Sequence, residues 1–231
     1  MTQPRETPAE LRHYGRRAFL AVTALGLSSL LWARPAWRMI SGATQPLQDA
    51  LPRGLVPSGW RIYTVAATMP RFDPVTWRLR IEGLVEQPLS LTYDDLRDLP
   101  RAEQVSDFHC VTGWSVKNVH WAGVRFRDLL GPAQMQPKAR VLTFVSAERP
   151  YVDTLTIEQA KLMDVMLAYE MDGKPLRREH GAPVRVVIPE MYGYKNVKWV
   201  ERIVVGAHAE PGYWEERGYD TDAWVGRSND G

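Results

Sequence analysis

The chain contains a single cysteine, Cys110, in a stretch that also carries two histidines, His109 and His120. A thiol in such surroundings is a small buried apolar side chain, a nucleophile with a histidine as its base, or a ligand to a metal. A classical zinc site is excluded, because there is no second cysteine and the histidines lack ligand spacing. The metal interpretation that remains is one soft thiolate given to a metal whose other ligands come from an organic cofactor.

A second stretch, from residue 167 to residue 200, places charged and aromatic residues at the ends of an apolar run. Arg185 interrupts this run, and a guanidinium in a buried strand requires an anionic partner. Lys195 and Lys198 follow Gly193, where the backbone can approach a ligand closely, and either lysine could meet a phosphate as a point charge. A solvated charged loop is the alternative interpretation of these residues.

The elements that must position these side chains are short. Residues 77–81 alternate apolar and charged side chains, which is the period of a half-buried strand. Capping boxes at Thr92–Asp95 and Thr156–Gln159 predict two short helices, the first of which runs to Leu99. Residues 141–145, 184–188 and 199–205 are predicted strands, with 184–188 central in its sheet because it is almost entirely apolar. Asp172-Gly173 predicts a tight turn. Together they indicate a single α+β domain, mixed and strand-rich with short helices.

Composition and charge limit the classes of protein to which this chain can belong. The 231 residues are 45% hydrophobic and 24% charged, which is ordinary for a globular protein. The net charge of +2 hides an asymmetry, because residues 1–43 hold six arginines and two glutamates and the remainder carries 23 basic and 25 acidic residues. The body is therefore not a nucleic-acid binder by charge. A lone cysteine also rules out an intramolecular disulfide.

The first 43 residues have the features of an export leader. Arg16 and Arg17 precede Phe19-Leu20 and an uncharged segment, residues 18–33, that is short for a spanning helix. This pattern is typical of a twin-arginine signal and predicts delivery to the periplasm or the outer face of the cytoplasmic membrane. An amphipathic helix or a tilted anchor is the alternative, and cleavage after residues 41–43 or retention as an anchor both stay open. Residues 44–60, rich in proline and glycine, are predicted to be a connector.

The two stretches together resemble the oxidoreductase molybdopterin-binding domain of the sulfite oxidase superfamily. The resemblance is strongest to small exported bacterial members, such as the catalytic subunits of periplasmic methionine-sulfoxide reductases. It is carried by these patterns: Cys110-Val-x-x-Trp114-Ser, Trp121-x-Gly123-Val, His180-Gly-x-Pro183-x-Arg185 and Tyr192-Gly-Tyr-Lys-x-x-Lys198-Trp199. It implies a sulfite-oxidase-like molybdopterin-binding fold over residues 61–215, followed by a C-terminal tail, residues 216–231.

The resemblance also implies a site. In this family molybdenum is held by the dithiolene of a pterin and by one cysteine thiolate, and Cys110 stands at that position. Residues matching the contacts of the pterin and its phosphate are His180, Arg185, Asn196, Val197 and Lys198. Ser146 matches a hydroxyl that contacts the cofactor, and Arg61, Tyr63 and Thr64 match an N-terminal contact region more loosely.

The implied activity is oxygen-atom transfer on a small substrate that is sulfoxide-like or sulfite-like. Sulfite is a dianion and favours an arginine-lined pocket. After Cys110 the chain has Val-Thr-Gly-Trp, and the arginine-bearing segment of the sulfite-oxidising enzymes is missing, although Arg149 or Lys117 could replace it. A neutral sulfoxide or N-oxide would need aromatic surface instead. The candidates for that surface are Trp114, Trp121, Tyr192 and Tyr194.

The chain carries no CxxCH haem motif and no flavin motif, so its electrons must be exchanged with a separate protein. A membrane or periplasmic cytochrome is the expected partner, and the leader allows association with the membrane. The alternative function is a non-catalytic, membrane-tethered module for molybdopterin binding or interaction, in which loss of the thiolate would be expected. A cysteine-nucleophile hydrolase is the third possibility.

Overall fold

The computed structural model describes residues 59–229, so the predicted leader and most of the predicted connector lie outside the described residues. The strands are β1 (Leu79–Gly83), β2 (Leu89–Leu91), β3 (Arg101–Cys110), β4 (Trp114–Arg125), β5 (Val141–Ser146), β6 (Val152–Thr156), β7 (Met166–Met171), β8 (Lys174–Pro175), β9 (Arg185–Val187) and β10 (Val200–Gly206). The helices are α2 (Tyr93–Arg97), α3 (Phe126–Leu130) and α4 (Ile157–Ala160), with 3-10 turns η1 (Arg178–His180) and η2 (Glu215–Arg217).

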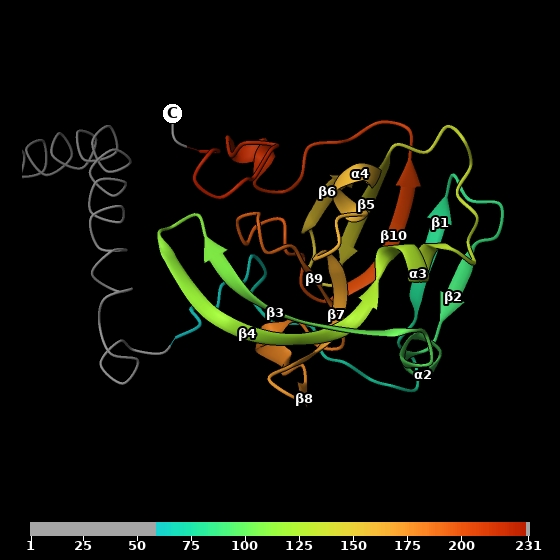
Figure 1. The fold of residues 1–231 in the computed structure, drawn as a ribbon, viewed down its shortest axis with the longest axis horizontal. Helices are drawn as coiled ribbons and strands as arrows, with labels where there is room; N and C mark the ends of the chain where they lie inside the picture. Colours follow the sequence, from blue (N-terminus) through green and yellow to red (C-terminus); the bar gives the residue numbers. More distant parts are fainter. Residues whose placement is uncertain (1–58, 230–231) are drawn as a thin grey trace, which may run out of the picture. The chain divides into compact units, whose positions relative to one another are not determined.

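The strands form two sheets (Figure 1). One sheet has the order β2-β1-β10-β5-β6, in which β1 and β10 are parallel and the other pairs antiparallel. The other has the order β3-β4-β7-β8, and β9 pairs with β7 beside β8. With only short helices between the strands, this mixed, strand-rich arrangement confirms the predicted α+β class.

The two sheets share one apolar core. Phe144 of β5 and Ile203 of β10 belong to the same buried cluster as Val124 of β4 and Leu167 of β7. Each side chain of this kind contributes about 1.5–3 kcal/mol when fully removed from water. The core therefore fixes the second sheet, which carries the cysteine, against the first.

Both predicted capping boxes are present. The Thr92 hydroxyl accepts the Asp95 amide, and the Asp95 carboxylate accepts the Thr92 amide in return. Thr156 and Gln159 make the same reciprocal pair at the start of α4. The first helix is shorter than predicted, since α2 ends at Arg97 and its C-cap is Asp98.

The prediction of a central strand over 184–188 was wrong. Within the described residues β9 spans only Arg185–Val187 and has β7 as its single strand partner, while its Val186 amide donates to the Val197 carbonyl at 2.8 Å. The apolar composition of this run correctly indicated that it is buried, since all three residues of β9 are buried. An apolar run indicates that both faces of a strand are covered, but the cover here comes partly from loops, so the run does not reveal how many strand neighbours exist.

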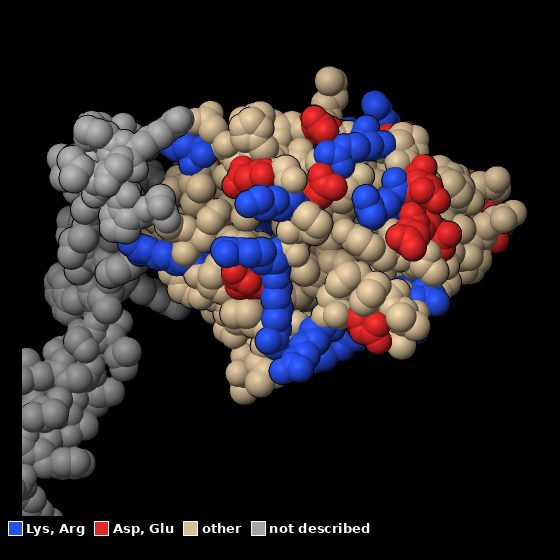
Figure 2. All heavy atoms as spheres, turned by 90° about the horizontal axis from the view of Figure 1, so that it is seen from below, with Lys and Arg blue, Asp and Glu red and all other residues tan. Residues whose placement is uncertain are grey.

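Basic and acidic side chains are interleaved over the described part of the face drawn in Figure 2, so that face carries no broad field of one sign. Ion pairs between neighbouring strands include Arg202 with Glu82, at 3.0 Å. Within residues 59–229 no helix has the length and apolar character needed to cross a membrane.

Candidate functional site

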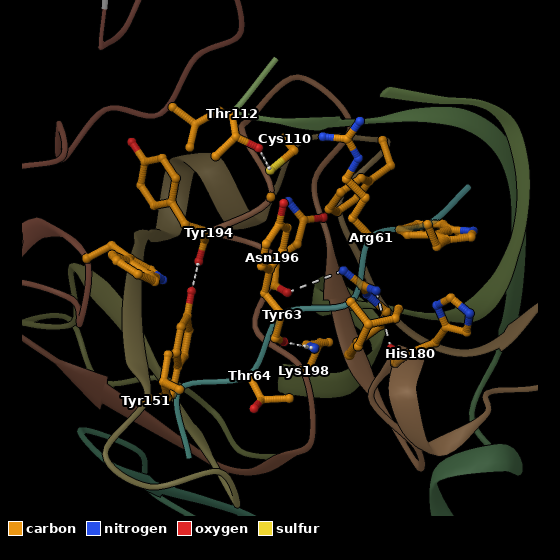
Figure 3. Close-up of a pocket in the computed structure, with 18 of the residues that line it drawn as sticks. Arg61, Tyr63, Thr64, Cys110, Thr112, Tyr151, His180, Tyr194, Asn196 and Lys198 are labelled. Atoms are coloured by element: carbon orange, nitrogen blue, oxygen red, sulfur yellow. Dashed lines mark hydrogen bonds between the residues drawn. The ribbon is translucent and has the colours of Figure 1, made fainter. Parts of the chain in front are cut away.

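The cysteine lies at the tip of a long hairpin. β3 ends at Cys110 and β4 begins at Trp114, its cross-strand partner, and the Gly113 amide closes the turn on the Cys110 carbonyl at 2.9 Å. The turn presents the thiol to a cavity of about 290 Å³. Figure 3 shows Cys110 beside Thr112 on one side of this cavity, with Lys198 and His180 on the other.

Most of the predicted site residues meet in this one cavity, although they come from distant parts of the chain. Those lining it are Arg61, Tyr63, Thr64, Cys110, His180, Arg185, Asn196 and Lys198. The cysteine hairpin and the second predicted stretch are joined directly, because the Gly193 amide donates to the His109 carbonyl at 2.7 Å. A side chain at Gly193 would collide with the Phe108 ring, which explains the glycine.

Arg185 is the most deeply buried cation of the cavity, with 2% of its surface exposed. Its guanidinium makes only long hydrogen bonds, to the carbonyls of His180 at 3.3 Å, Asn196 at 3.4 Å and Val186 at 3.5 Å. It also lies against the rings of Trp60 and Trp121. No carboxylate pairs with it among residues 59–229. Burial lowers its pKa to about 10, so it still carries its charge at neutral pH. A buried, unpaired guanidinium calls for an anion from outside the protein.

Two further groups support an anion at the same place. The Lys198 ammonium lies 4.0 Å from the Trp199 ring and donates to the Tyr63 carbonyl at 2.7 Å. His180 is buried and its Nδ1 has no hydrogen-bond partner within the described residues. Burial, together with the charge of Arg185, lowers the pKa of His180 to about 4, so the ring is neutral at pH 7 and holds a free donor or acceptor.

Anion binding by the cofactor-free protein should depend on pH through Lys198. Burial, and next the charge of Arg185, lower the Lys198 pKa from 10.5 to about 7, so its charge is lost above that pH. Sulfate, which stays a dianion, should raise the melting temperature several-fold more at about pH 6 than at about pH 8.5. Because the folded pKa lies below the unfolded value, the protein without sulfate should gain stability as pH rises from 7 towards 10.5.

The Lys198→Met variant is the control for this measurement. It keeps Arg185, so sulfate should still produce a small shift, but the shift should be the same at both pH values. A sulfate shift in the unchanged protein that did not vary with pH would contradict the assignment.

The N-terminal contact region is held in place by Glu148. One oxygen of this buried carboxylate accepts the amides of Val65 and Ala66, at 2.8 Å and 3.3 Å. Together with the Lys198 bond to Tyr63, this fixes the segment from Trp60 to Ala66 along the cavity. Sequence reasoning missed Glu148, since a single glutamate outside any motif gives no signal. It also placed Trp60 in the connector, whereas Trp60 lines the cavity.

Ser146 and Val197 do not line the cavity. The Ser146 hydroxyl donates to the Lys198 carbonyl at 2.8 Å and accepts the Glu148 amide at 2.9 Å, so it supports two residues that do. The Val197 amide donates to the Lys195 carbonyl at 2.9 Å. A direct contact of either residue with a cofactor stays a prediction.

The prediction that Lys195 could meet a phosphate was wrong. Its ammonium points away from the cavity, to Asp153 at 2.7 Å and to Glu215. Neighbouring turn residues can send long side chains to opposite sides of a loop, so the spacing of the two lysines did not show that only Lys198 faces the cavity.

Of the aromatic residues suggested for substrate contact, two line the cavity and two do not. Trp114 and Tyr194 line the cavity, whereas Trp121 and Tyr192 do not. Two further aromatic residues line it from the C-terminal end of the chain, Trp214 and Tyr219, the latter from the predicted tail. The suggested replacements for a sulfite-binding arginine are elsewhere. Arg149 pairs with Glu201, and Lys117 lies 3.4 Å from Asp107.

The surroundings of Cys110 disfavour a hydrolytic thiolate. Its sulfur lies 3.2 Å from the Thr112 hydroxyl, and neither His109 nor His120 lines the cavity. Burial raises the pKa of the Cys110 thiol, which opposes the unassisted thiolate that a nucleophile requires. A bound metal ion would deprotonate the thiol outright. Over residues 59–229 no cluster of three or more histidine, cysteine or carboxylate side chains could hold an ion by itself.

Comparison with known proteins decides among these interpretations. Residues 66–214 match the oxidoreductase molybdopterin binding domain family. The chain belongs to this family. Membership confirms the predicted cofactor, a molybdenum–pterin, and the oxidoreductase class. The donor set fits that group, with one soft thiolate on one side of the cavity and an unpaired buried guanidinium on the other.

Several known proteins are similar to this chain over about two thirds of the length of this chain. An uncharacterized oxidoreductase of Bacillus subtilis is 36% identical over 68% of this chain and 80% of its own. Human mitochondrial sulfite oxidase is 34% identical over 65% of this chain and 33% of its own. The protein-methionine-sulfoxide reductase catalytic subunit MsrP of Campylobacter jejuni is 29% identical over 62% and 54%.

A solved structure agrees with this assignment. The sulfane dehydrogenase SoxCD of Paracoccus pantotrophus superposes with a TM-score of 0.61 at 29% identity, covering 65% of this chain and 43% of that one. The molybdopterin oxidoreductase described here thus spans most of the Bacillus protein, but only a third to a half of the other relatives. The predicted sulfite-oxidase-like fold is confirmed.

Proposed function

We propose that this protein is an exported molybdenum–pterin oxidoreductase that transfers an oxygen atom to or from a small substrate and exchanges electrons with a separate redox protein. The observation that carries the proposal is a single cavity with the Cys110 thiol on one side and the unpaired, buried Arg185 guanidinium on the other. Such a cavity suits a cofactor with a thiophilic metal and a phosphate.

The two ends of the cavity would bind different parts of the cofactor. Cys110 would ligate the molybdenum as a thiolate, and Arg185 and Lys198 would bind the phosphate of the pterin, with His180 as a hydrogen-bond partner. When bound, the group supplies the two-electron redox chemistry that amino-acid side chains lack. The protein would orient it, and the Thr112 hydroxyl, 3.2 Å from the cysteine sulfur, would donate a hydrogen bond to the thiolate.

The walls near Cys110 favour a neutral, sulfoxide-like substrate over sulfite. The cavity is lined by the rings of Trp114, Tyr194 and Trp214. Burial raises the Cys110 pKa, and the charge of Arg61 lowers it by a smaller amount. Arg185 and Lys198, the other Lys or Arg side chains that line the cavity among the described residues, are assigned here to the phosphate. A dianion would require several cations there, whereas a sulfoxide requires one donor and apolar surface. A turnover comparison tests this: kcat/KM for a small sulfoxide should exceed kcat/KM for sulfite.

Metal analysis tests the proposal as a whole. Protein purified from a molybdenum-replete host should contain about one equivalent of molybdenum per chain. A folded preparation without molybdenum would refute the proposed function. A full equivalent without turnover on any oxygen-atom acceptor or donor would favour the non-catalytic binding module instead.

Export rests on the leader alone, and it has its own prediction. Changing Arg16 and Arg17 to lysine keeps both charges but removes the arginine pair that a twin-arginine transporter recognises. The variant should stay in the cytoplasm, which cell fractionation and immunoblotting would detect. Unchanged arrival outside the membrane would mean that the leader acts in another way. A membrane or periplasmic cytochrome is the proposed electron partner, because the protein would meet it there.

A further inference from the structure

A buried ionic cluster lies outside the set of residues that line the cofactor cavity. Its centre is Lys195, whose ammonium lies 2.7 Å from a carboxylate oxygen of Asp153 and 3.1 Å from the Thr154 carbonyl, and also contacts the Glu215 carboxylate. The Lys195 and Asp153 side chains are each 1% exposed and that of Glu215 is 4% exposed. Burying three charges is costly, and only their mutual pairing and hydrogen bonds offset that cost.

Glu215 belongs to a segment that we call the C-terminal strap, residues 210–220. The second oxygen of Glu215 accepts the Gly212 amide at 2.9 Å, and the Tyr213 amide donates to the Val152 carbonyl of β6 at 2.9 Å. A side chain at residue 212 would collide with the Asp153 carboxylate, so the strap can approach the cluster this closely only with glycine there.

The strap forms part of the cavity wall. Trp214 and Tyr219, on either side of η2, both line the cavity. The Tyr219 ring lies 5.4 Å from that of Tyr194, the residue that precedes Lys195, and the Tyr194 hydroxyl donates to the Asp220 carbonyl at 2.7 Å. The strap also contacts the body through the stacked rings of Tyr151 and Tyr213, 5.5 Å between centroids, and through the Thr154 hydroxyl, which donates to the Glu210 carbonyl at 3.4 Å. The Glu215 carboxylate supplies its ionic connection to Lys195.

We propose that Lys195 is a positioning residue that latches the C-terminal strap onto the body of the domain through Glu215, and thereby sets the aromatic wall of the substrate and cofactor cavity. The chain thus uses its two neighbouring lysines for different tasks. Lys198 faces the cavity, and Lys195 holds the wall that closes it.

The charges of the cluster make this latch testable without unfolding the protein. One ammonium serves two carboxylates, and the second Asp153 oxygen has no hydrogen-bond partner in the described structure. Burial raises the pKa of Asp153 to about 6, the Lys195 ammonium lowers it, and Glu215 raises it; Tyr151 and Tyr194 also face this group. Removing Glu215 therefore leaves Lys195 and Asp153 as a balanced pair, with no unpaired buried charge.

The experiment compares Glu215→Ala with Glu216→Ala by amide hydrogen exchange on the full chain. The two residues are neighbours with the same charge, but Glu216 is exposed and its carboxylate only reaches Arg217, at 3.5 Å. In Glu215→Ala the strap amides, such as those of Tyr213 and Gly218, should exchange about ten-fold faster than in Glu216→Ala, while β5 and β10 amides keep their protection. Equal strap exchange in the two variants would overturn the proposal.

A second variant separates latching from general destabilisation. Leu129→Ala opens a cavity in the core of the domain, far from the cluster in sequence, and should lower protection throughout without a selective effect on the strap. If it loosened the strap relative to β5 as much as Glu215→Ala does, the latch would be refuted.

Turnover provides a further measurement, which rests on the proposed function. Glu215→Ala should raise KM for the substrate several-fold while changing kcat less, because the wall binds substrate but does not touch the metal ligand. If the protein had no turnover at all, the exchange result would still decide on the latch.

Discussion

Replacing Cys110 by serine is expected to leave a folded protein without turnover. The side chain keeps nearly the same volume at the tip of the β3–β4 hairpin, so the Thr112 contact and the Gly113 turn can persist. Serine, however, offers a hard, protonated oxygen where molybdenum requires a soft thiolate. Absorption spectra should lose the thiolate-to-metal bands, and activity should fall by at least about a thousand-fold, close to the background.

The matched control is Thr112→Val, which keeps the ligand but removes the hydroxyl next to its sulfur. It should retain molybdenum and turnover, with a shift of the same absorption bands, because only a hydrogen bond to the sulfur is lost. Wild-type turnover by Cys110→Ser would refute the assignment of Cys110 as the ligand.

Arg185→Leu is expected to separate cofactor affinity from fold stability. In the wild-type protein the guanidinium is buried with no carboxylate partner among residues 59–229, so it is stabilised chiefly when an anion binds. The variant should be purified with little molybdenum–pterin, and its cofactor-free form should unfold at the same or a higher urea concentration than cofactor-free wild type. The wild-type protein should gain several kcal/mol from the cofactor by mass action, roughly 4 kcal/mol at a thousand-fold excess over Kd.

Arg178→Leu is the control for this result, since that guanidinium is exposed and its Nε donates to the Pro70 carbonyl at 2.9 Å outside the cavity. It should keep its full cofactor content. A full cofactor content in Arg185→Leu, combined with lower stability, would assign the guanidinium to a structural task in the carbonyl cage formed by His180 and Asn196.

Local rules account for what could be predicted from the sequence. The capping boxes at Thr92 and Thr156 depend on residues three apart, and the alternation in β1 depends on the geometry of one strand. The meeting of Cys110 with Arg185 and Lys198 was predictable only because two long patterns occur in a known order. The two stretches are joined by the Gly193 amide, which donates to the His109 carbonyl. This is a hydrogen bond between backbone groups, so no side chain in the sequence indicates it.

What could not be predicted depends on partners far away in the chain. Glu148 reaches Val65 across 83 positions, and the direction of Lys195 is set by Asp153 and Glu215, at 42 and 20 positions. A glutamate or lysine has the same local preferences whether it faces solvent, a ligand or a buried counter-charge. The tertiary fold determines which of these surroundings the side chain meets, a buried counter-charge for Lys195 and the cavity for Lys198.

The cavity has walls from both ends of the described domain, with Trp60 to Val65 from one end and Trp214 and Tyr219 from the other. During synthesis the first wall leaves the ribosome about 150 residues before the second, at roughly 5–20 residues per second. A nascent chain shorter than about 220 residues therefore cannot enclose a ligand, however well its sheets have formed. Enclosure of the cofactor thus requires that synthesis has passed the C-terminal strap, which supplies the last wall of the cavity among the described residues.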